Sequence, residues 1–97
     1  MGAMSAADWR AFWQARGMRE LQLLLWAAWG PMDDGSPAEY DGYAVRVASL
    51  LGSRASRDAI AAELGRIRGD ELGLDPDPAE DARPAAKITA WFEAAAA

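Results

Sequence analysis

Residues 23–29 read Leu-Leu-Leu-Trp-Ala-Ala-Trp, and this uninterrupted apolar stretch decides which fold the sequence predicts. Leucine and alanine are good helix formers, and a helix that is apolar on every side is usually buried on every side. Gly30-Pro31 follows directly and ends the helix, because proline cannot continue it. The stretch therefore predicts the end of a helix that lies wholly inside a helical core.

The same helix extends back along the chain to about Ser5. Ser5 is a suitable N-cap, and Asp8 places a carboxylate in the first turn, where the helix dipole favours a negative charge. Gly17 lies in the middle, where glycine costs about 1 kcal/mol relative to alanine. We therefore expect one helix over residues 5–29 that is weakened or kinked at Gly17.

Aromatic residues gather near the two ends of the chain. Trp9, Phe12 and Trp13 share one helix face because they are spaced at i, i+3 and i+4. Trp91 and Phe92 belong to the last apolar stripe of the sequence. We expect the two groups to pack against each other; the alternative is an exposed aromatic ridge that serves as a binding hot spot.

Two further helices have clear start and stop signals. Ser36-Pro37-Ala38-Glu39 is a capping box with proline at the first helical position, and Gly52 ends the helix that follows. Ser56 is the N-cap of the next helix, and Gly73 suits the left-handed residue that ends it. Apolar residues at helical spacing predict the buried stripes of both helices: Tyr40, Tyr43, Ala44, Val47, Leu50 and Leu51 in the first, and Ile60, Leu64, Ile67 and Leu72 in the second.

Prolines shape the last part of the chain. Asp77 with Pro78 predicts a capped helical turn that reaches Ala82. Pro84 predicts a break, because a proline inside a helix removes a backbone hydrogen bond and clashes with the preceding turn. The last helix then covers residues 84–95. Its buried stripe contains Ala85, Ile88, Trp91, Phe92 and Ala95.

Short connections join these helical segments, which favours antiparallel neighbours. A chain of 97 residues forms one domain around one core. The sequence thus predicts an all-α fold, a compact single-domain bundle of about four helices over residues 5–97. Residues 1–4 are interpreted as an expression remnant with the native start at Met4. No apolar run approaches the roughly 20 residues of a membrane span, so no contact with a membrane is expected.

The residue types that the chain lacks exclude much chemistry. Without cysteine and histidine it has no thiolate, no imidazole base and none of the commonest metal ligands. No glycine-rich phosphate loop and no nucleophile elbow occurs, and the carboxylates of Glu39 and Asp41 do not share a helix face. We therefore expect no enzyme activity and no cofactor, and a cytoplasmic location agrees with the absence of cysteine. A hydrolase that uses carboxylates and a metal ion stays the third hypothesis.

The net charge of −5 is unevenly distributed. Residues 1–44 carry three basic and six acidic groups, residues 45–69 carry five arginines and two acids, and residues 70–97 carry two basic and seven acidic groups. Aromatic residues do not interleave with the five arginines and no nucleic-acid motif is present, so no nucleic-acid partner is expected. The charge pattern instead favours a basic protein as partner.

The stretch 70–81 holds six carboxylates and no cation. Such a stretch can steer a basic partner, and the alternative is a solvated acidic surface that keeps the protein soluble. A second acidic patch lies at residues 33–41. The predicted partner-binding residues are Asp70, Glu71, Asp75, Asp77, Glu80 and Asp81 in the first patch and Asp33, Asp34, Glu39 and Asp41 in the second.

Three short motifs occur in a characteristic order: Trp29-Gly30-Pro31-Met32, Glu39-Tyr40-Asp41-Gly42-Tyr43 and Glu71-Leu72-Gly73-Leu74. With them the chain resembles a family of small bacterial all-helical proteins of unknown function. That family carries Trp-Asp-Pro-Ile-Gly or its leucine form, then Glu-Tyr-Asp-x-Tyr, then Glu-x-x-Gly-Leu. Here Gly30 replaces the aspartate and Met32 the branched aliphatic residue. The resemblance implies a compact helical domain and no particular reaction.

These observations favour a protein-binding module. The most concrete form is an immunity-type inhibitor whose acidic patches cover a basic site on a toxin, a link that rests on size and acidity alone. The second hypothesis is a structural or regulatory subunit that associates through an apolar surface such as Trp9, Phe12 and Trp13 and exists as a monomer or homodimer. The sequence identifies neither the partner nor the oligomeric state.

Overall fold

The computed structural model describes residues 5–31 and 35–96, and within these ranges every element is a helix. In chain order the α-helices are α1 (Ala6–Phe12), α2 (Met18–Leu24), α3 (Asp41–Gly52), α4 (Arg57–Arg66) and α5 (Pro78–Ala96). Wider π-helical turns continue three of these helices, at Trp13–Gly17, Leu25–Trp29 and Ile67–Glu71, and a 3₁₀ turn, Pro37–Tyr40, precedes α3. The expected all-α single-domain bundle is confirmed.

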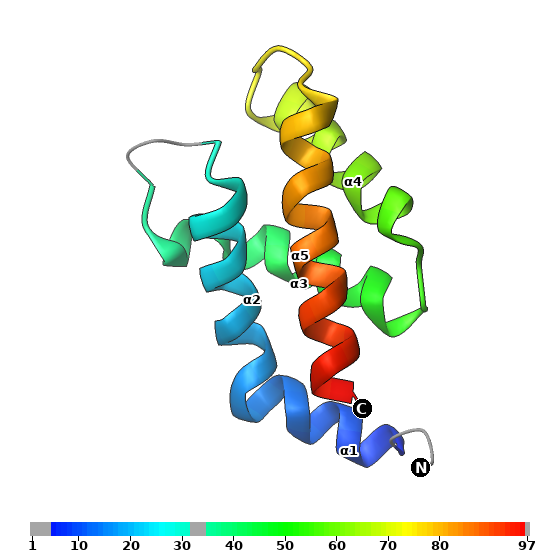
Figure 1. Cartoon of the computed structure of the whole chain (residues 1–97). Helices are drawn as coiled ribbons and strands as arrows, with labels where there is room; N and C mark the ends of the chain where they lie inside the picture. The colour runs from blue at the N-terminus through cyan, green and yellow to red at the C-terminus, as the bar shows by residue number, and fades with distance from the viewer. Residues whose placement is uncertain (1–4, 32–34, 97) are drawn as a thin grey trace.

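The helices surround one core, and α5 runs through the middle of the bundle between α2 and α4 (Figure 1). The radius of gyration of 13.2 Å is close to the value of about 12.5 Å for a compact domain of this length. The predicted stripes supply most of the buried apolar residues. These are Leu21, Leu25, Trp29, Tyr40, Ala44, Val47, Leu51, Ile60, Leu64, Ile67, Ala85 and Ile88.

The first helical rod bends between α1 and α2, as Figure 1 shows. The bend coincides with the π-helical turn Trp13–Gly17, and such turns are a common cause of helix kinks. A Cβ atom on Gly17 would lie 2.6 Å from a ring carbon of Phe12 and 2.6 Å from one of Trp13. The predicted kink at Gly17 is therefore confirmed, and glycine is required there because two aromatic rings cover its backbone.

The variant Gly17→Ala is expected to lower the free energy of unfolding by about 1–3 kcal/mol, the usual cost of overpacking a core. Gly69→Ala is the matched control, because Gly69 is also helical and a Cβ there would meet nothing within 4 Å. The control should gain up to about 1 kcal/mol from helix propensity. Urea denaturation measures both, and stabilisation by both substitutions would contradict the steric explanation.

The apolar stretch 23–29 is not buried on every side, so this expectation was wrong. Leu25 and Trp29 belong to the core, but Leu23 is 43% and Trp26 is 42% exposed. In so small a bundle each helix has neighbours on only part of its circumference, and here the neighbours are α5, α3 and the 3₁₀ turn Pro37–Tyr40. The indole N–H of Trp26 donates a 2.8 Å hydrogen bond to the carbonyl of Gly35, which ties the exposed ring to the start of the next helical segment.

Local capping signals are confirmed. Ser36 and Glu39 form the predicted capping box, and the Ser56 hydroxyl accepts a hydrogen bond from the third backbone N–H beyond it. Gly73 adopts a φ of 66°, the left-handed conformation expected of a helix-ending glycine. The N–H of Leu74 then donates to the carbonyl of Arg68 at 2.9 Å. These residues fix where the 3₁₀ turn before α3 begins, where α4 begins and where the π-helical turn after α4 ends.

The helix break predicted at Pro84 does not occur, and this expectation is corrected. α5 is continuous from Pro78 to Ala96, and Asp77 caps it by accepting a 3.3 Å hydrogen bond from the N–H of Glu80. An interior proline costs about 3 kcal/mol. Pro84 is fully buried beside the core residues Ala85 and Ile88, so burial of this face of α5 offsets that cost.

Candidate protein-binding groove between α4 and α5

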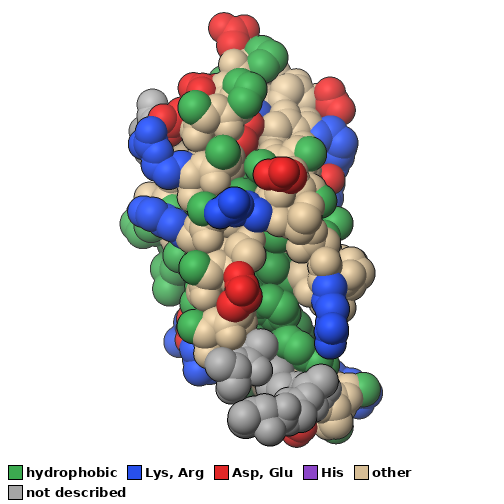
Figure 2. All heavy atoms as spheres, turned by 45° about the vertical axis from the view of Figure 1, so that its right-hand side comes forward, with side chains coloured by type: hydrophobic (Ala, Val, Ile, Leu, Met, Phe, Trp, Pro, Cys, Tyr) green, Lys and Arg blue, Asp and Glu red, His purple; other side chains and the backbone are tan. Residues whose placement is uncertain are grey.

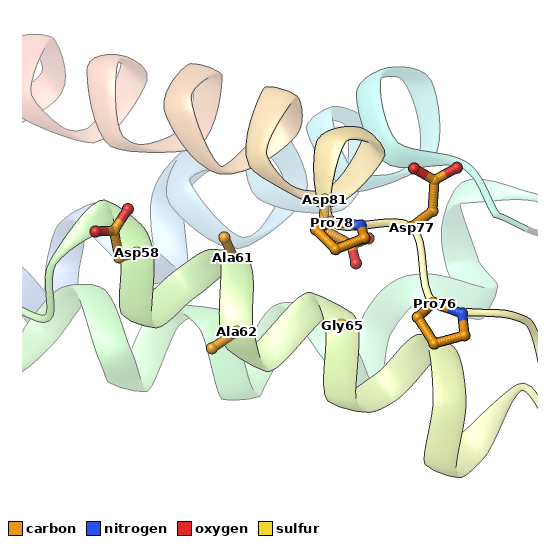
Figure 3. A pocket seen from close by; sticks show the side chains of 8 residues that line it. All are labelled: Asp58, Ala61, Ala62, Gly65, Pro76, Asp77, Pro78 and Asp81. Carbon is orange, nitrogen blue, oxygen red and sulfur yellow. The ribbon is translucent and has the colours of Figure 1, made fainter.

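α4 and α5 form an antiparallel hairpin joined by a short connection after Gly73 (Figure 1). Small residues occupy the outer side of this hairpin, so the two helices leave a hollow between them. One groove of about 380 Å³ runs along it (Figure 3). Its lining consists of alanine, glycine and proline walls with three carboxylates, namely Asp58, Ala61, Ala62, Gly65, Pro76, Asp77, Pro78 and Asp81.

A second hollow of about 500 Å³ continues the groove along the hairpin. The two hollows share Asp58 and Ala61, and the second adds Arg57 and Arg83 among further alanines. Figure 2 views the face that brings α4 forward, and it shows acidic and basic side chains interspersed with hydrophobic atoms. The hairpin therefore offers a concave apolar floor with Asp77 and Asp81 toward the connection, its acidic end, and with Asp58 beside Arg57 toward the start of α4.

Asp81, one of the predicted partner-binding residues, is buried and not exposed as its acidic stretch suggested. It is 3% exposed, and its Oδ1 accepts hydrogen bonds from Arg68 Nε at 3.0 Å and from Trp29 Nε1 at 2.8 Å. Arg68 Nη2 lies 3.0 Å from the same oxygen. A buried carboxylate needs a cation and hydrogen-bond donors, and these two residues supply both. Asp81 thus joins α5 to the ends of two other helical segments.

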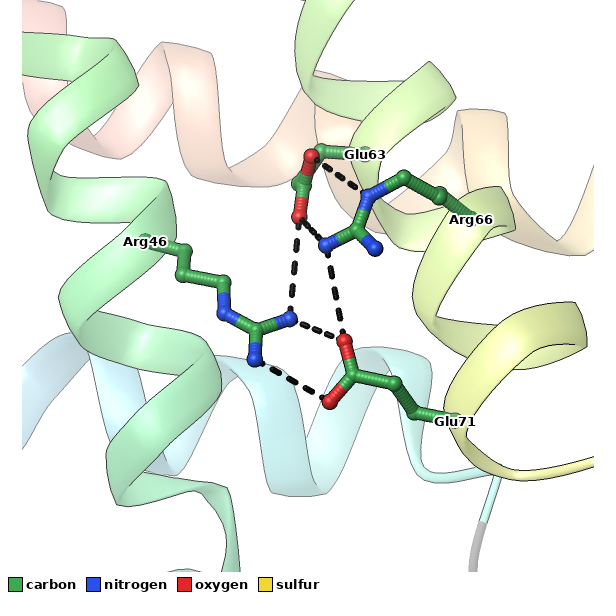
Figure 4. Close-up of polar contacts among 4 residues, drawn as sticks. All are labelled: Arg46, Glu63, Arg66 and Glu71. Atoms are coloured by element: carbon green, nitrogen blue, oxygen red, sulfur yellow. Dashed lines mark hydrogen bonds and ion pairs between the residues drawn. The ribbon is translucent and has the colours of Figure 1, made fainter.

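Glu71 also serves the fold. It forms an ion-pair network with Arg46, Glu63 and Arg66 that connects α3 to α4 and its π-helical turn (Figure 4). Arg46 donates two hydrogen bonds to the Glu71 carboxylate, and Arg66 lies 3.4 Å from it. These bonds hold the pKa of Glu71 below its ordinary value, and the hydrogen bonding to Arg46 has the largest effect. Its charge is largely neutralised within the network.

The other predicted acidic residues differ in how free their charges are. Asp70 and Asp75 are exposed and form no ion pair with a residue in the described ranges. Glu80 is exposed and lies 3.5 Å from Arg83, and Asp77 caps α5. The predicted residues Asp33 and Asp34 lie outside the described residues.

The predicted second patch contributes two residues to the described structure. Glu39 completes the capping box, and Asp41 accepts a 2.7 Å hydrogen bond from Gln22. Both are exposed, but Glu39 lies in the 3₁₀ turn and Asp41 is the first residue of α3, and neither lines the groove between α4 and α5. The groove instead brings in Asp58, which the sequence analysis did not include. The small residues Ala61, Ala62 and Gly65 were the signal that one side of α4 could form a hollow.

The motif residues that support the family resemblance have structural roles. Tyr40 and Tyr43 pack edge-on against Trp29, with ring centroids 6.1 Å apart in both pairs. Glu39 completes the capping box of the 3₁₀ turn before α3. Gly73 ends the helical segment that α4 and its π-helical turn form. These residues therefore determine the fold, whatever else they do.

Neither metal binding nor membrane insertion is evident in the described parts of the chain. Among residues 5–31 and 35–96, no group of three or more acidic side chains is placed to hold a metal ion. No helix in these ranges is long and apolar enough to cross a membrane. Comparison of the chain with protein-family models, with curated proteins and with solved structures finds no match. The family resemblance thus stays a prediction that rests on its three motifs.

Proposed function

We propose that this protein is a non-catalytic protein-binding module, in its most concrete form a cytoplasmic inhibitor of the immunity type that covers a basic site on its partner. One observation carries the proposal: exposed carboxylates without an ion-pair partner in the described structure lie beside a concave apolar groove. Asp58 lines that groove, and Asp75 lies in the connection next to it. Asp58 lies in the first turn of α4 and Asp75 in the connection, so a partner with basic side chains at both ends of the groove would neutralise both.

Charge supports a basic partner. Glu71 and Asp81 are paired with arginines of the protein itself, but Asp70, Asp75 and Asp58 are exposed and have no ion-pair partner among the described residues. Carboxylates at the rim of an interface act mainly on the association rate, because they attract an oppositely charged partner before contact. The expected signature is association that slows as salt rises.

The apolar floor supplies the second requirement. Stable interfaces have an apolar centre surrounded by a polar rim. Ala62 in α4 and Ala82 in α5 are exposed, and both line the hollows of the hairpin. A protruding side chain or helix ridge of the partner would exclude water from this floor.

The immobilised protein should retain the partner from a lysate of the source organism at low salt and release it at high salt. Association of the partner with the purified protein should slow in Asp75→Asn and stay unchanged in Glu93→Gln. Both variants remove one exposed carboxylate that has no described ion pair. Glu93 lies fifteen residues beyond the start of α5, about 22 Å along its axis and well past the Debye length of about 8 Å.

Surface plasmon resonance across a salt series measures the association rates. We expect a loss of about twofold to fivefold in the rate for Asp75→Asn at low salt, and a smaller loss as salt rises. Equal rates for both variants at low salt would contradict a role for the acidic end of the hairpin.

A second candidate function, a structural or regulatory subunit, is favoured by the exposed apolar residues Leu23 and Trp26. They lie three positions apart and so share one side of the first helical rod. Light scattering tests this candidate: a mass that rises from 10.4 kDa with concentration, and falls back in Leu23→Ser, would support self-association through this side. A constant monomer mass would remove the homodimer.

A further inference from the structure

Asp81 presents one unused oxygen to the groove. Its Oδ1 takes the contacts with Arg68 and Trp29, whereas its Oδ2 accepts no hydrogen bond from a described residue. The side chain is 4% exposed and still lines the groove, and Figure 3 shows its carboxylate between Pro78 and Gly65. A carboxylate oxygen has two lone pairs for hydrogen bonds, so Oδ2 can accept donors that enter from the groove.

Gly65 keeps this oxygen accessible. A Cβ atom at position 65 would lie 3.2 Å from Asp81 Oδ2, which is a tight contact for a Cβ atom. Any larger side chain on this turn of α4 would cover the oxygen. The glycine therefore leaves an opening in the groove floor directly above a buried, charged acceptor.

The charge balance of the groove favours a cation over a neutral donor. Arg68 compensates one carboxylate, Asp81, but Asp58 and Asp77 also line the groove and form no ion pair with a described residue. Arg57 and Arg83 line the adjoining hollow without pairing with either carboxylate, so both carboxylates remain available to a cation from a partner. The walls are alanine and proline, which suit a methylene stem rather than a compact hydrated ion.

We infer that the groove receives an arginine side chain of the partner protein, with its guanidinium donating to Asp81 Oδ2. This inference rests on the proposed protein-binding function and names the chemistry that the groove recognises. Guanidinium fits better than ammonium because it is planar and weakly hydrated, and its donors form a rigid fork that matches a carboxylate. A volume of about 380 Å³ is at the lower end of ligand sites and suits one side chain.

Ethylguanidinium is the probe, titrated at constant ionic strength into the ¹⁵N-labelled protein. The indole N–H of Trp29 is the reporter, because it donates to the other oxygen of the same carboxylate. We expect a saturable shift of this signal with a millimolar dissociation constant. n-Butylammonium should bind more weakly, and equal or tighter binding of the ammonium would overturn the choice of guanidinium.

Matched variants localise the binding. Asp77→Asn removes a groove charge but keeps a residue type that caps helices well. It should lower the affinity for ethylguanidinium about fivefold, the effect of one partly exposed charge pair. Gly65→Ala should lower the affinity for ethylguanidinium more than Asp77→Asn does, because the added methyl group covers Asp81 Oδ2. Asp75→Asn removes a charge from the same connection without lining the groove and should change the affinity less than about twofold.

The outcomes separate this inference from the proposed function. No saturable shift at Trp29, or equal losses in Asp77→Asn and Asp75→Asn, would overturn the arginine pocket. A captured partner whose association depends on Asp75 but whose affinity is unchanged by Gly65→Ala would also overturn it and leave the proposed function intact. Binding of ethylguanidinium without any salt-sensitive partner would instead contradict the proposed function alone.

Discussion

Replacing Asp81 with alanine is expected to lower the free energy of unfolding by about 3–5 kcal/mol, the usual cost of removing one partner of a buried ion pair. The Arg68 side chain is 11% exposed and would keep its charge without a counter-ion. The Trp29 indole N–H would lose its acceptor at the same time. Domains of this size have about 5–15 kcal/mol of stability in total, so urea denaturation should show a large shift of the midpoint.

Two further variants identify the cause of this loss. Arg68→Met combined with Asp81→Leu removes both charges, and such apolar replacements are often neutral or stabilising, so the double variant should recover most of the lost stability. Trp29→Phe removes only the indole hydrogen bond and should cost about 1 kcal/mol. A double variant as unstable as Asp81→Ala would show that packing, and not the unpaired charge, explains the effect.

The sequence was sufficient for features that depend on neighbouring residues. The capping box at Ser36 and Glu39, the N-cap at Ser56 and the helix stop at Gly73 all occur as predicted. Each involves contacts within a few positions along the chain, so the residues that make it can be recognised together. The kink at Gly17 has the same local origin, since the rings above it belong to the same helical rod.

The role of Asp81 could not be predicted in the same way. It lies in a run of six carboxylates that looks solvated, but Arg68 and Trp29, which hold it in the interior, are 13 and 52 positions away. The continuity of α5 through Pro84 has a similar explanation. Local rules predict a break there, and burial of the proline against the rest of the bundle overrides them.

The sequence predicted the acidic charge of the candidate site but not the groove that gives the site its shape. The sequence predicted exposed charges at Asp70 and Asp75, because both belong to an acidic stretch that contains no cation. The groove depends on how α4 and α5 are aligned, because residues of both helices form its walls. Gly65 contributes to that alignment, because a Cβ atom there would lie 3.2 Å from Asp81 Oδ2 of α5. Asp58 therefore lines the groove as a consequence of this tertiary contact between α4 and α5.

The aromatic contact between α1 and α5 is the basis of the second large effect. α1 has no fully buried residue, so its position depends on rings that pack across the end of the bundle. Phe92 stacks on Trp9 with centroids 5.0 Å apart and planes at 19°, and on Trp13 at 5.9 Å and 18°. The expected packing of Trp9 and Trp13 against the last helix is thus confirmed, and the half-buried rings form no separate exposed ridge.

Phe92→Ala is expected to lower the free energy of unfolding by about 2–3 kcal/mol, less than for a fully buried phenylalanine because Phe92 is half-buried. Amide exchange in residues 6–12 should become roughly 30- to 140-fold faster, since a tenfold change corresponds to about 1.4 kcal/mol of local opening. Exchange followed by mass spectrometry or NMR measures it. Val45→Ala, at a position that is 53% exposed, is the control and should change stability by less than about 0.5 kcal/mol.

The loosened segment should end at the bend near Gly17. The indole N–H of Trp91 donates a 2.8 Å hydrogen bond to Glu20, which ties α5 to α2 and does not involve α1. Arg16 and Trp91 both bond to this carboxylate and hold the pKa of Glu20 below its ordinary value, so the tie persists at neutral pH. Removing Phe92 therefore releases the chain before Gly17 and leaves α2 in place. Uniformly faster exchange in α1 and α2 would mean that the bent rod is held as one rigid unit.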